Sequence, residues 1–181
     1  VDRQCGSSQQ ALHFAAQAVM SGTMDVVIAS GVESMTRVPM GVSVMLPAKE
    51  GYGEPKSPRQ EERYPNIQFS QFMGAEMVAK KYGLTKDQLD EYGYLSHQRA
   101  IAATQGGAFR DELLAIDGLD KEGNVVRHDS DEGIRFDVSM EGMRGVKLLQ
   151  EGGAITAVTS SQICDAASGV MIVSDEALKE H

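Results

Sequence analysis

The chain has 181 residues, of which 41% are hydrophobic and 24% are charged, and its formal net charge is −9. This is the composition of a soluble globular protein. It contains no apolar run of the ~20 residues that a membrane-spanning helix needs, and no basic face for nucleic acid. Cys5 and Cys164 are the only cysteines. Their spacing fits neither a disulfide framework nor a metal site, so we expect a reducing, cytoplasmic location and no bound metal.

The first predicted element is an amphipathic helix at residues 7–21. Ser7 or Ser8 can cap its start, and Gly22 can end it in a left-handed conformation. Its apolar residues recur at the spacing of one helix face: Ala11, Leu12, Ala15, Ala18 and Val19.

Short apolar runs predict strands on either side of the middle section. The run DVVIAS at residues 25–30 is typical of a strand that is covered on both faces, and Gly31 is expected to end it. Together with an extended run before Cys5, it predicts a right-handed strand–helix–strand crossover. Two further strands and a final helix are predicted at residues 152–161, 168–174 and 175–181.

The middle section is predicted to begin with a long loop, because residues 38–72 lack periodicity and contain all five prolines. The string TKDQ at residues 85–88 is a capping box, which predicts the start of a long helix. The strings DELLAID and GNVVRHD flank GLDKE and predict a β-hairpin. Helices are predicted at residues 74–82, 85–104 and 139–149, the last with Ser139 as its cap.

Cys5 is the candidate for covalent chemistry. It lies where the first helix begins, and unpaired N–H groups with a partial charge of about +0.5 at a helix start interact favourably with an anion such as a thiolate. Gly6 leaves room for another backbone, as in the strand–nucleophile–helix turn of hydrolases. On spacing alone, a small buried cysteine with no chemical role is the commoner outcome.

Four longer strings resemble the thiolase family, in the order in which that family has them. The resemblance implies an α/β protein with part of a layered α-β-α core and an inserted loop domain, incomplete in this chain. It places the end of the N-terminal core at residues 1–37, the loop domain at 38–152 and the last strand of the core at 153–181. The strings are DRQCGSSQQALHFAAQAVMSGTMDVVIASGVESMTRVP, FMGAEMVAKKYGLTKDQLDEY, EGIRFDVSMEGM and GGAITAVTSSQICDAASGVMIVSDEA.

The resemblance also implies roles for four residues. Cys5 matches the cysteine that takes the acyl group, and Met73 matches a methionine that lines the pocket. Arg135 matches an arginine near the nucleotide of coenzyme A, and Ser161 matches a serine that contacts the pantetheine arm. Without the resemblance, Met73 fits core filler equally well and Arg135 reads as an ordinary surface charge. Cys164, which stands where the family has asparagine, is interpreted as structural.

The activity implied is that of an acetyl-CoA C-acyltransferase of fatty acid metabolism. Acyl-CoA and coenzyme A are its substrates, there is no permanently bound cofactor, and it forms a homodimer or homotetramer. The family's Gly-His-Pro, Cys-x-Gly-Gly-Gly and Asn-Glu motifs are absent from this sequence, so we interpret it as a fragment. The alternatives are an inactive module for CoA binding or oligomerisation and a condensing enzyme of ketosynthase type. His97 matches no catalytic histidine and is expected to be exposed.

Overall fold

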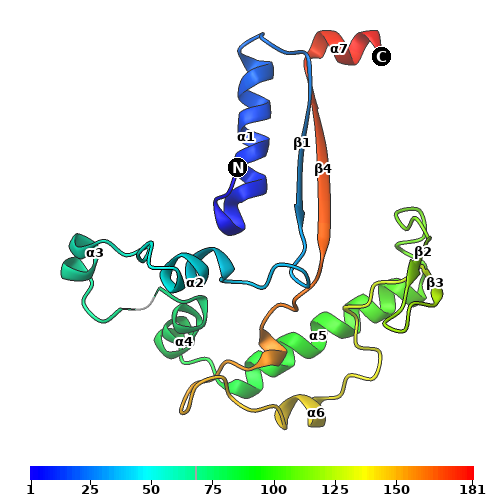
Figure 1. Ribbon diagram of the computed structural model, residues 1–181. Coiled ribbons are helices and arrows are strands. Elements are labelled where there is room, and N and C mark those ends of the chain that lie inside the picture. Colours follow the sequence, from blue (N-terminus) through cyan, green and yellow to red (C-terminus); the bar gives the residue numbers. More distant parts are fainter. Residues whose placement is uncertain (68) are drawn as a thin grey trace. The chain divides into compact units, whose positions relative to one another are not determined.

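The structure is a computed structural model that describes residues 1–67 and 69–181 (Figure 1). These residues form two compact units, each described by itself. Unit 1 contains residues 1–60 and 163–181, and unit 2 contains residues 61–162. The division at residues 38 and 153 that the family resemblance implies stays a prediction.

Unit 1 is built on an antiparallel pair of strands. β1 (Val26–Glu33) pairs with β4 (Ala166–Val173), from Val26 opposite Val173 to Glu33 opposite Ala166. Helix α1 packs against both strands, as Figure 1 shows. The other elements of this unit are η1 (Gln4–Gly6), α1 (Ser7–Met20), α2 (Val42–Lys49) and α7 (Asp175–Glu180), while α3 (Pro58–Arg63) crosses the unit boundary.

The helix predicted at residues 7–21 is confirmed as α1, and Gly22 has the expected positive φ of 71°. The cap prediction is wrong, because Gly6 is the N-cap residue and makes no side-chain bond. The predicted crossover is also wrong, since residues 1–3 form no strand and β1 pairs antiparallel with β4. That pairing carries β1 past Gly31 to Glu33, because a glycine can take part in a ladder of backbone bonds.

The loop prediction for residues 38–72 is wrong where α2 and α3 form. Pro58 is the first residue of α3, a position where the missing N–H of proline has no helical partner to lose. Helix α2 contains Pro47 and begins after Gly41, whose φ is 90°. The number of prolines therefore overestimates the length of the loop, because proline is also found within helices here. Residue 68, which belongs to the same prediction, lies outside the described residues.

Unit 2 contains the longest helix, α5, whose predicted capping box between Thr85 and Gln88 is confirmed. The hairpin is confirmed with Ile116 opposite His128, and Ser139 caps α6 as predicted. The strand predicted at residues 152–161 is wrong, because Thr156 caps a short 3₁₀ turn there. The elements are α4 (Gln71–Tyr82), α5 (Lys86–Gln105), β2 (Ile116–Leu119), β3 (Val125–His128), α6 (Met140–Arg144) and η2 (Ala157–Thr159).

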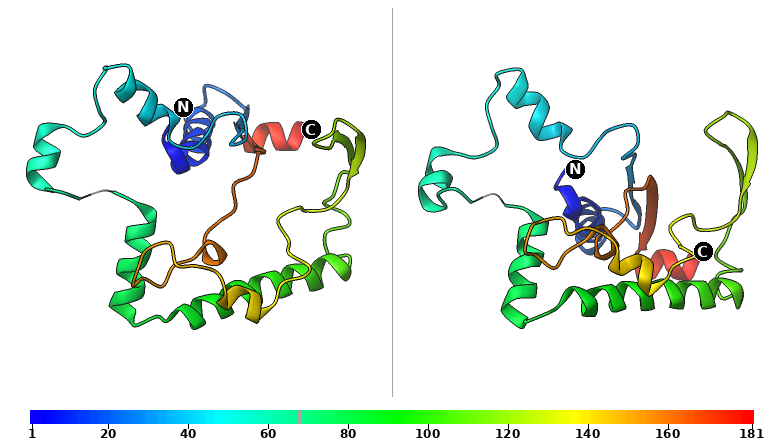
Figure 2. Two further views of the ribbon diagram at one scale, coloured as in Figure 1. Left: turned by 60° about the horizontal axis from the view of Figure 1, so that its bottom comes forward. Right: turned by 90° about the horizontal axis from the view of Figure 1, so that it is seen from below.

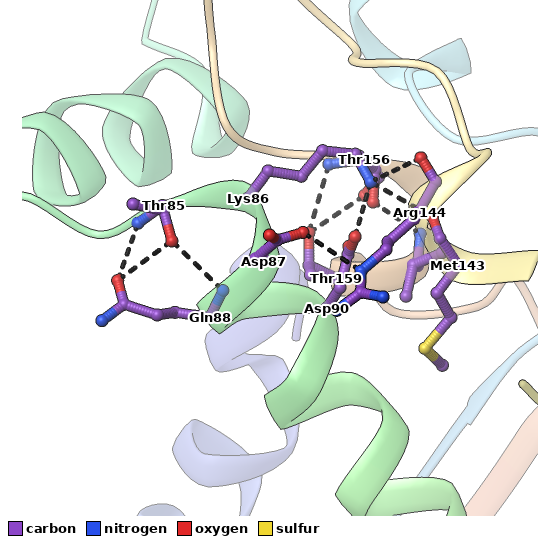
Figure 3. Close-up of polar contacts among 10 residues, drawn as sticks. Thr85, Lys86, Asp87, Gln88, Asp90, Met143, Arg144, Thr156 and Thr159 are labelled. Atoms are coloured by element: carbon purple, nitrogen blue, oxygen red, sulfur yellow. Dashed lines mark hydrogen bonds and ion pairs between the residues drawn. The ribbon is translucent and has the colours of Figure 1, made fainter. Parts of the chain in front are cut away.

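An ion pair within α5, one partner of which also bonds to α6, connects these two helices, which lie side by side in Figure 2. Asp90 on α5 is completely buried, and Lys86 Nζ donates to its Oδ2 at 2.5 Å. The same ammonium donates to the carbonyl oxygens of Met143 and Arg144 at 3.2 Å each (Figure 3). Asp90 Oδ1 has no hydrogen-bond partner among the described residues. Lys86 therefore connects the start of α5 to the end of α6.

Among the described residues, few apolar side chains are fully buried, and none of the helices is long and apolar enough to cross a membrane. Met143 and Ile155 are the large members of this buried set, and both lie in unit 2. The buried apolar residues are Ala15, Ala79, Met143, Ile155 and Ala177.

Candidate active site

Cys5 lies in the tight turn that leads into α1. The turn is the 3₁₀ segment η1, and Gln4 just before the cysteine has a left-handed φ of 52°. A residue other than glycine with such a φ costs about 1–3 kcal/mol and persists only where its surroundings hold it. The side chain of Cys5 is exposed. The backbone therefore turns sharply to place an accessible thiol at the start of a 14-residue helix.

Hydrogen bonds on both sides hold this turn. Ser7 Oγ accepts from the Arg3 N–H and donates to the Gln4 carbonyl oxygen, both at 2.7 Å. Asp2 Oδ1 accepts from the Gln4 N–H at 3.0 Å, and the Arg3 guanidinium donates to Gln10 Oε1 at 2.6 Å. These contacts explain how the left-handed Gln4 is kept. Ser7, predicted as a helix cap, instead stabilises the turn that carries Cys5.

Strand β1 approaches the first turn of α1 closely. A Cβ placed on Gly31 would lie 2.9 Å from Ser8 Oγ, so only glycine fits without a shift of Ser8. Gly31 therefore matters because it lets the strand pass beside the helix start, rather than because it ends the strand. This contact helps to fix the position of the turn at Cys5 within unit 1.

Asp165 stabilises the segment that directly follows β1, and the sequence did not predict this role. Its carboxylate accepts from Thr36 Oγ1 at 2.6 Å, from the Thr36 N–H at 3.0 Å and from Ser34 Oγ at 3.2 Å. The hydrogen bond from the Thr36 hydroxyl, followed by that from its N–H, lowers the pKa of Asp165 below 3.8. The signal in the sequence was an acidic residue directly before β4 and two hydroxyl residues directly after β1. Cys164, its neighbour, is exposed.

The other candidate residues, Met73, Arg135 and Ser161, belong to unit 2. Met73 lies on α4 with 42% of its surface exposed, so it does not fill a core in this structure. One turn later, Glu76 accepts hydrogen bonds from the N–H groups of Ala154 (2.8 Å) and Ile155 (2.9 Å). Glu76 thus attaches the helix of Met73 to the segment that leads towards Ser161.

Arg135 and Ser161 are both exposed. The N–H of Arg135 donates to Nδ1 of His97 on α5 at 3.2 Å. His97 is half-buried, so the expectation that it is exposed is wrong: the turn that contains Arg135 covers it. The side chain of Gln162, next to Ser161, packs against Gly133 in that same turn. The structure therefore brings the turn of Arg135 and the segment of Ser161 together, and Met73 takes no part in these described contacts.

An open groove of about 380 Å³ lies between α5 and α6 in unit 2. One wall carries the exposed ion pair of Arg144 Nε and Asp87 Oδ1, which are 3.4 Å apart. None of the four candidate residues lines it. The lining residues are Asp87, Gln88, Glu91, Tyr94, Leu95, Met140 and Arg144. Within the described ranges, no group of three or more His, Cys, Asp or Glu side chains could hold a metal ion.

The chain is similar in sequence to proteins that are named as 3-ketoacyl-CoA thiolases. It is 40% identical over 183 residues to the steroid 3-ketoacyl-CoA thiolase FadA6 of Mycobacterium tuberculosis, an alignment covering 100% of this chain and 44% of that protein. It is 39% identical over 186 residues to a 3-ketoacyl-CoA thiolase of a Psychrobacter species, with 99% and 44% covered. The chain therefore spans less than half the length of these relatives.

Solved structures agree with the sequence relatives. Human mitochondrial 3-ketoacyl-CoA thiolase superposes with a TM-score of 0.76 at 27% identity, over 100% of this chain and 47% of that one. The acetyl-CoA acetyltransferase of Syntrophomonas wolfei gives 0.74 at 29% identity, over 99% and 46%. These likenesses confirm the expected α/β fold as part of a thiolase fold. Residues 1–176 match the family described as "Thiolase, N-terminal domain", and the chain therefore belongs to the thiolase family.

Proposed function

We propose that this chain supplies the acyl-accepting part of an acyl-CoA:CoA acyltransferase. The observation that carries the proposal is the exposed thiol of Cys5, held by a strained and hydrogen-bonded turn at the start of α1. A thiolate is both a good nucleophile and a good leaving group, as a reversible acyl carrier requires. The reaction is thiolytic cleavage of a 3-ketoacyl-CoA, or in reverse the condensation of acetyl-CoA.

The covalent step can be written for Cys5 Sγ. Its lone pair forms a bond to the C3 carbonyl carbon of the 3-ketoacyl-CoA, and the C2–C3 bond breaks. The electron pair stays on C2 of the departing acetyl-CoA, which takes up a proton. Coenzyme A then loses its thiol proton, attacks the thioester carbonyl, and releases Cys5 as a thiolate. The residues that move these protons would come from the Gly-His-Pro and Cys-x-Gly-Gly-Gly motifs that this sequence lacks.

Three residues of unit 2 are proposed to bind the substrate. Arg135 would contact the nucleotide phosphates, since a guanidinium forms strong charge-assisted bonds with them. Ser161 would contact the pantetheine arm, and Met73 would line the acyl pocket. Coenzyme A is thus a substrate rather than a resident cofactor. Assembly as a homodimer or homotetramer is part of this proposal.

Acylation of Cys5 tests the chemical part of the proposal. The chain is incubated with acetyl-CoA or acetoacetyl-CoA, and its intact mass and peptide map are recorded. We expect one acetyl group on Cys5, none after Cys5→Ser, and an unchanged result after Cys164→Ser, which removes the other thiol. Equal acetylation of Cys5 and Cys164 would contradict an acyl-accepting role, because it would reflect ordinary thiol exchange.

A second candidate is a module that binds coenzyme A without chemistry. It is favoured by the share of the relatives that the chain spans, 44%, and by the absence of the proton-transfer motifs. Two measurements on the same protein separate the candidates. If the chain is only a binding module, titration calorimetry should detect binding of coenzyme A while mass spectrometry finds Cys5 unacylated. In that case Cys5→Ser leaves the affinity unchanged.

A further inference from the structure

The turn at residues 131–135 is stabilised from inside and covered from outside. Asp131 Oδ1 accepts a hydrogen bond from the Gly133 N–H at 2.7 Å. The side-chain amide of Gln162 packs so closely on Gly133 that a Cβ at this position would overlap it. A larger residue at position 133 would therefore displace the end of the Gln162 side chain. Since Gln162 follows Ser161 directly, this contact couples the turn to Ser161.

His97 holds the other end of the same turn. It lies on α5, a helix of 20 residues, and its Nδ1 accepts the Arg135 N–H at 3.2 Å. An imidazole accepts through Nδ1 only when it is neutral and carries its proton on Nε2. The bond fixes the backbone of Arg135 to a rigid element and leaves its side chain unconstrained.

The Arg135 side chain is exposed and available to a ligand. Among the described residues, Arg135 takes part in no ion pair, unlike Lys86, Arg127 and Arg144. A guanidinium without a carboxylate partner, on a backbone held in place, is suited to bind an anion with little loss of backbone freedom.

We infer that His97 and Gln162 are positioning residues, which hold the 131–135 turn so that Arg135 and Ser161 face one coenzyme A ligand together. The inference rests on the proposed function, because that function supplies the ligand class: a thioester with anionic phosphates at one end and a pantetheine arm. His97 acts through Arg135 on the phosphate end. Gln162, through Gly133, sets the distance between that end and Ser161.

The rate of hydrogen exchange of the Arg135 amide reports whether its bond to His97 is present, and it can be measured without any ligand. We expect protection in the wild type and after His97→Asn, because the asparagine Oδ1 can accept near the position of Nδ1. We expect at least tenfold faster exchange after His97→Phe, which keeps a ring but has no acceptor. Equal exchange in all three proteins would overturn the role of His97, and thermal unfolding checks that each variant is folded.

The affinities for coenzyme A and for pantetheine, which lacks the nucleotide, test whether the bond between His97 and Arg135 supports binding of the nucleotide phosphates. His97→Phe should weaken coenzyme A binding about tenfold, because Arg135 is then no longer held in place for its charge-assisted bond to phosphate, and leave pantetheine binding unchanged. His97→Asn should restore the affinity for coenzyme A. In an Arg135→Ala background His97→Phe should have no further effect. A further loss there, or equal losses for both ligands, would overturn the inference, since His97 would then act by another route.

Gly133→Ala tests the Gln162 contact. It should weaken the binding of both coenzyme A and pantetheine, because the added methyl group displaces the Gln162 side chain that covers the turn beside Ser161. Gly118→Ala is the matched control, since a Cβ at Gly118 meets nothing within 4 Å and both positions belong to unit 2. Equal effects of the two glycine substitutions would overturn the role of Gln162.

The failure of this inference can be told from the failure of the proposed function. If the wild type binds coenzyme A and the His97 and Gly133 variants bind it equally well, only the inference fails. If the wild type binds neither coenzyme A nor pantetheine while the Arg135 amide is protected, the ligand assignment fails, and with it the proposed function and the inference.

Discussion

The two units stabilise their elements by different means. In unit 2, the completely buried Asp90 pairs with Lys86 one turn earlier on α5, and the completely buried Thr156 bonds within its own short turn to Thr159. In unit 1, the antiparallel pair β1–β4 leaves large apolar side chains exposed, with exposed fractions from 48% at Val26 to 81% at Val32. The exposed apolar residues on these strands are Val26, Ile28, Val32, Val170 and Met171.

This difference shows where single substitutions should matter. A pair of strands gains little from apolar side chains that stay in water, since stabilisation scales at about 25 cal/mol per Å² of apolar surface removed from it. A buried charge, by contrast, destabilises strongly as soon as its partner is removed. The largest losses of stability are therefore expected where Lys86 contacts Asp90 and the end of α6 in unit 2. The smallest are expected on the exposed strand faces of unit 1.

The largest effect is expected for Lys86→Met. It leaves Asp90 buried without a counter-ion and removes the bonds to the carbonyl oxygens of Met143 and Arg144. The expected loss in free energy of unfolding is about 3–5 kcal/mol, measured by urea unfolding. Because two units need not unfold together, hydrogen exchange should assign the loss to α5 and α6.

Two control variants sharpen this prediction. Arg144→Met breaks the exposed pair with Asp87, in which the side chains are 60% and 70% exposed, and should cost at most about 1 kcal/mol. The double change Lys86→Met with Asp90→Leu removes both charges of the pair, including the buried one of Asp90, and should recover most of the lost stability. A double variant as unstable as Lys86→Met alone would show that the charge of Asp90 is not the cause.

An intermediate effect is expected from the pH dependence at Asp165 in unit 1. Hydrogen bonds, first from the Thr36 hydroxyl, lower the pKa of Asp165 in the folded chain below 3.8. A carboxylate with a lowered pKa adds stability above its unfolded pKa of about 3.9, and this contribution is lost as the pH falls through the lower folded value. The protection of the amides of residues 33–36 against hydrogen exchange, expressed relative to the intrinsic rate at each pH, should therefore decrease as the solution is acidified below about pH 4.

Asp165→Asn separates this effect from general acid unfolding. The variant should exchange faster at residues 33–36 at neutral pH and lose the extra acid dependence there. Asp175→Asn, at another exposed acidic position of unit 1, is the control and should leave the exchange of residues 33–36 unchanged. If Asp165→Asn keeps the same acid dependence as the wild type, another carboxylate is responsible.

Local signals predicted much of the fold. The capping box at Thr85, the Ser139 cap and the left-handed Gly22 are set by neighbouring residues, and the structure has each of them. Pairing was not predictable in this way. The partner of β1 lies more than 130 residues away at β4, and the apolar run of β1 does not encode its direction. Antiparallel pairing had to come from the structure.

The candidate residues show the same limit. A recognisable motif identified Cys5, Met73, Arg135 and Ser161, whereas the residues that hold them in place carry no local pattern. Glu76 bonds to backbone 78 residues away, and His97 to backbone 38 residues away. Such contacts depend on how distant segments pack together. The sequence around His97 does not show this packing, and for that reason it predicted an exposed residue.

The smallest effect is expected for Ile28→Thr on β1, whose side chain is 64% exposed. Threonine keeps the β-branch that suits a strand, so the free energy of unfolding should change by no more than about 0.5 kcal/mol. Val27→Thr is the matched control, because this neighbour points to the opposite, partly buried side of the strand. Its added hydroxyl should cost about 1 kcal/mol or more.

The pair also tests whether the exposed face of β1 stays in water. If Ile28→Thr costs as much as Val27→Thr, that face is covered in solution, because the loss of a methylene and the gain of a hydroxyl cost little where the side chain stays in water. A second copy of the chain would then be the simplest cover. Sedimentation at rising protein concentration would detect it as self-association of the wild type that Ile28→Thr weakens and Val27→Thr does not.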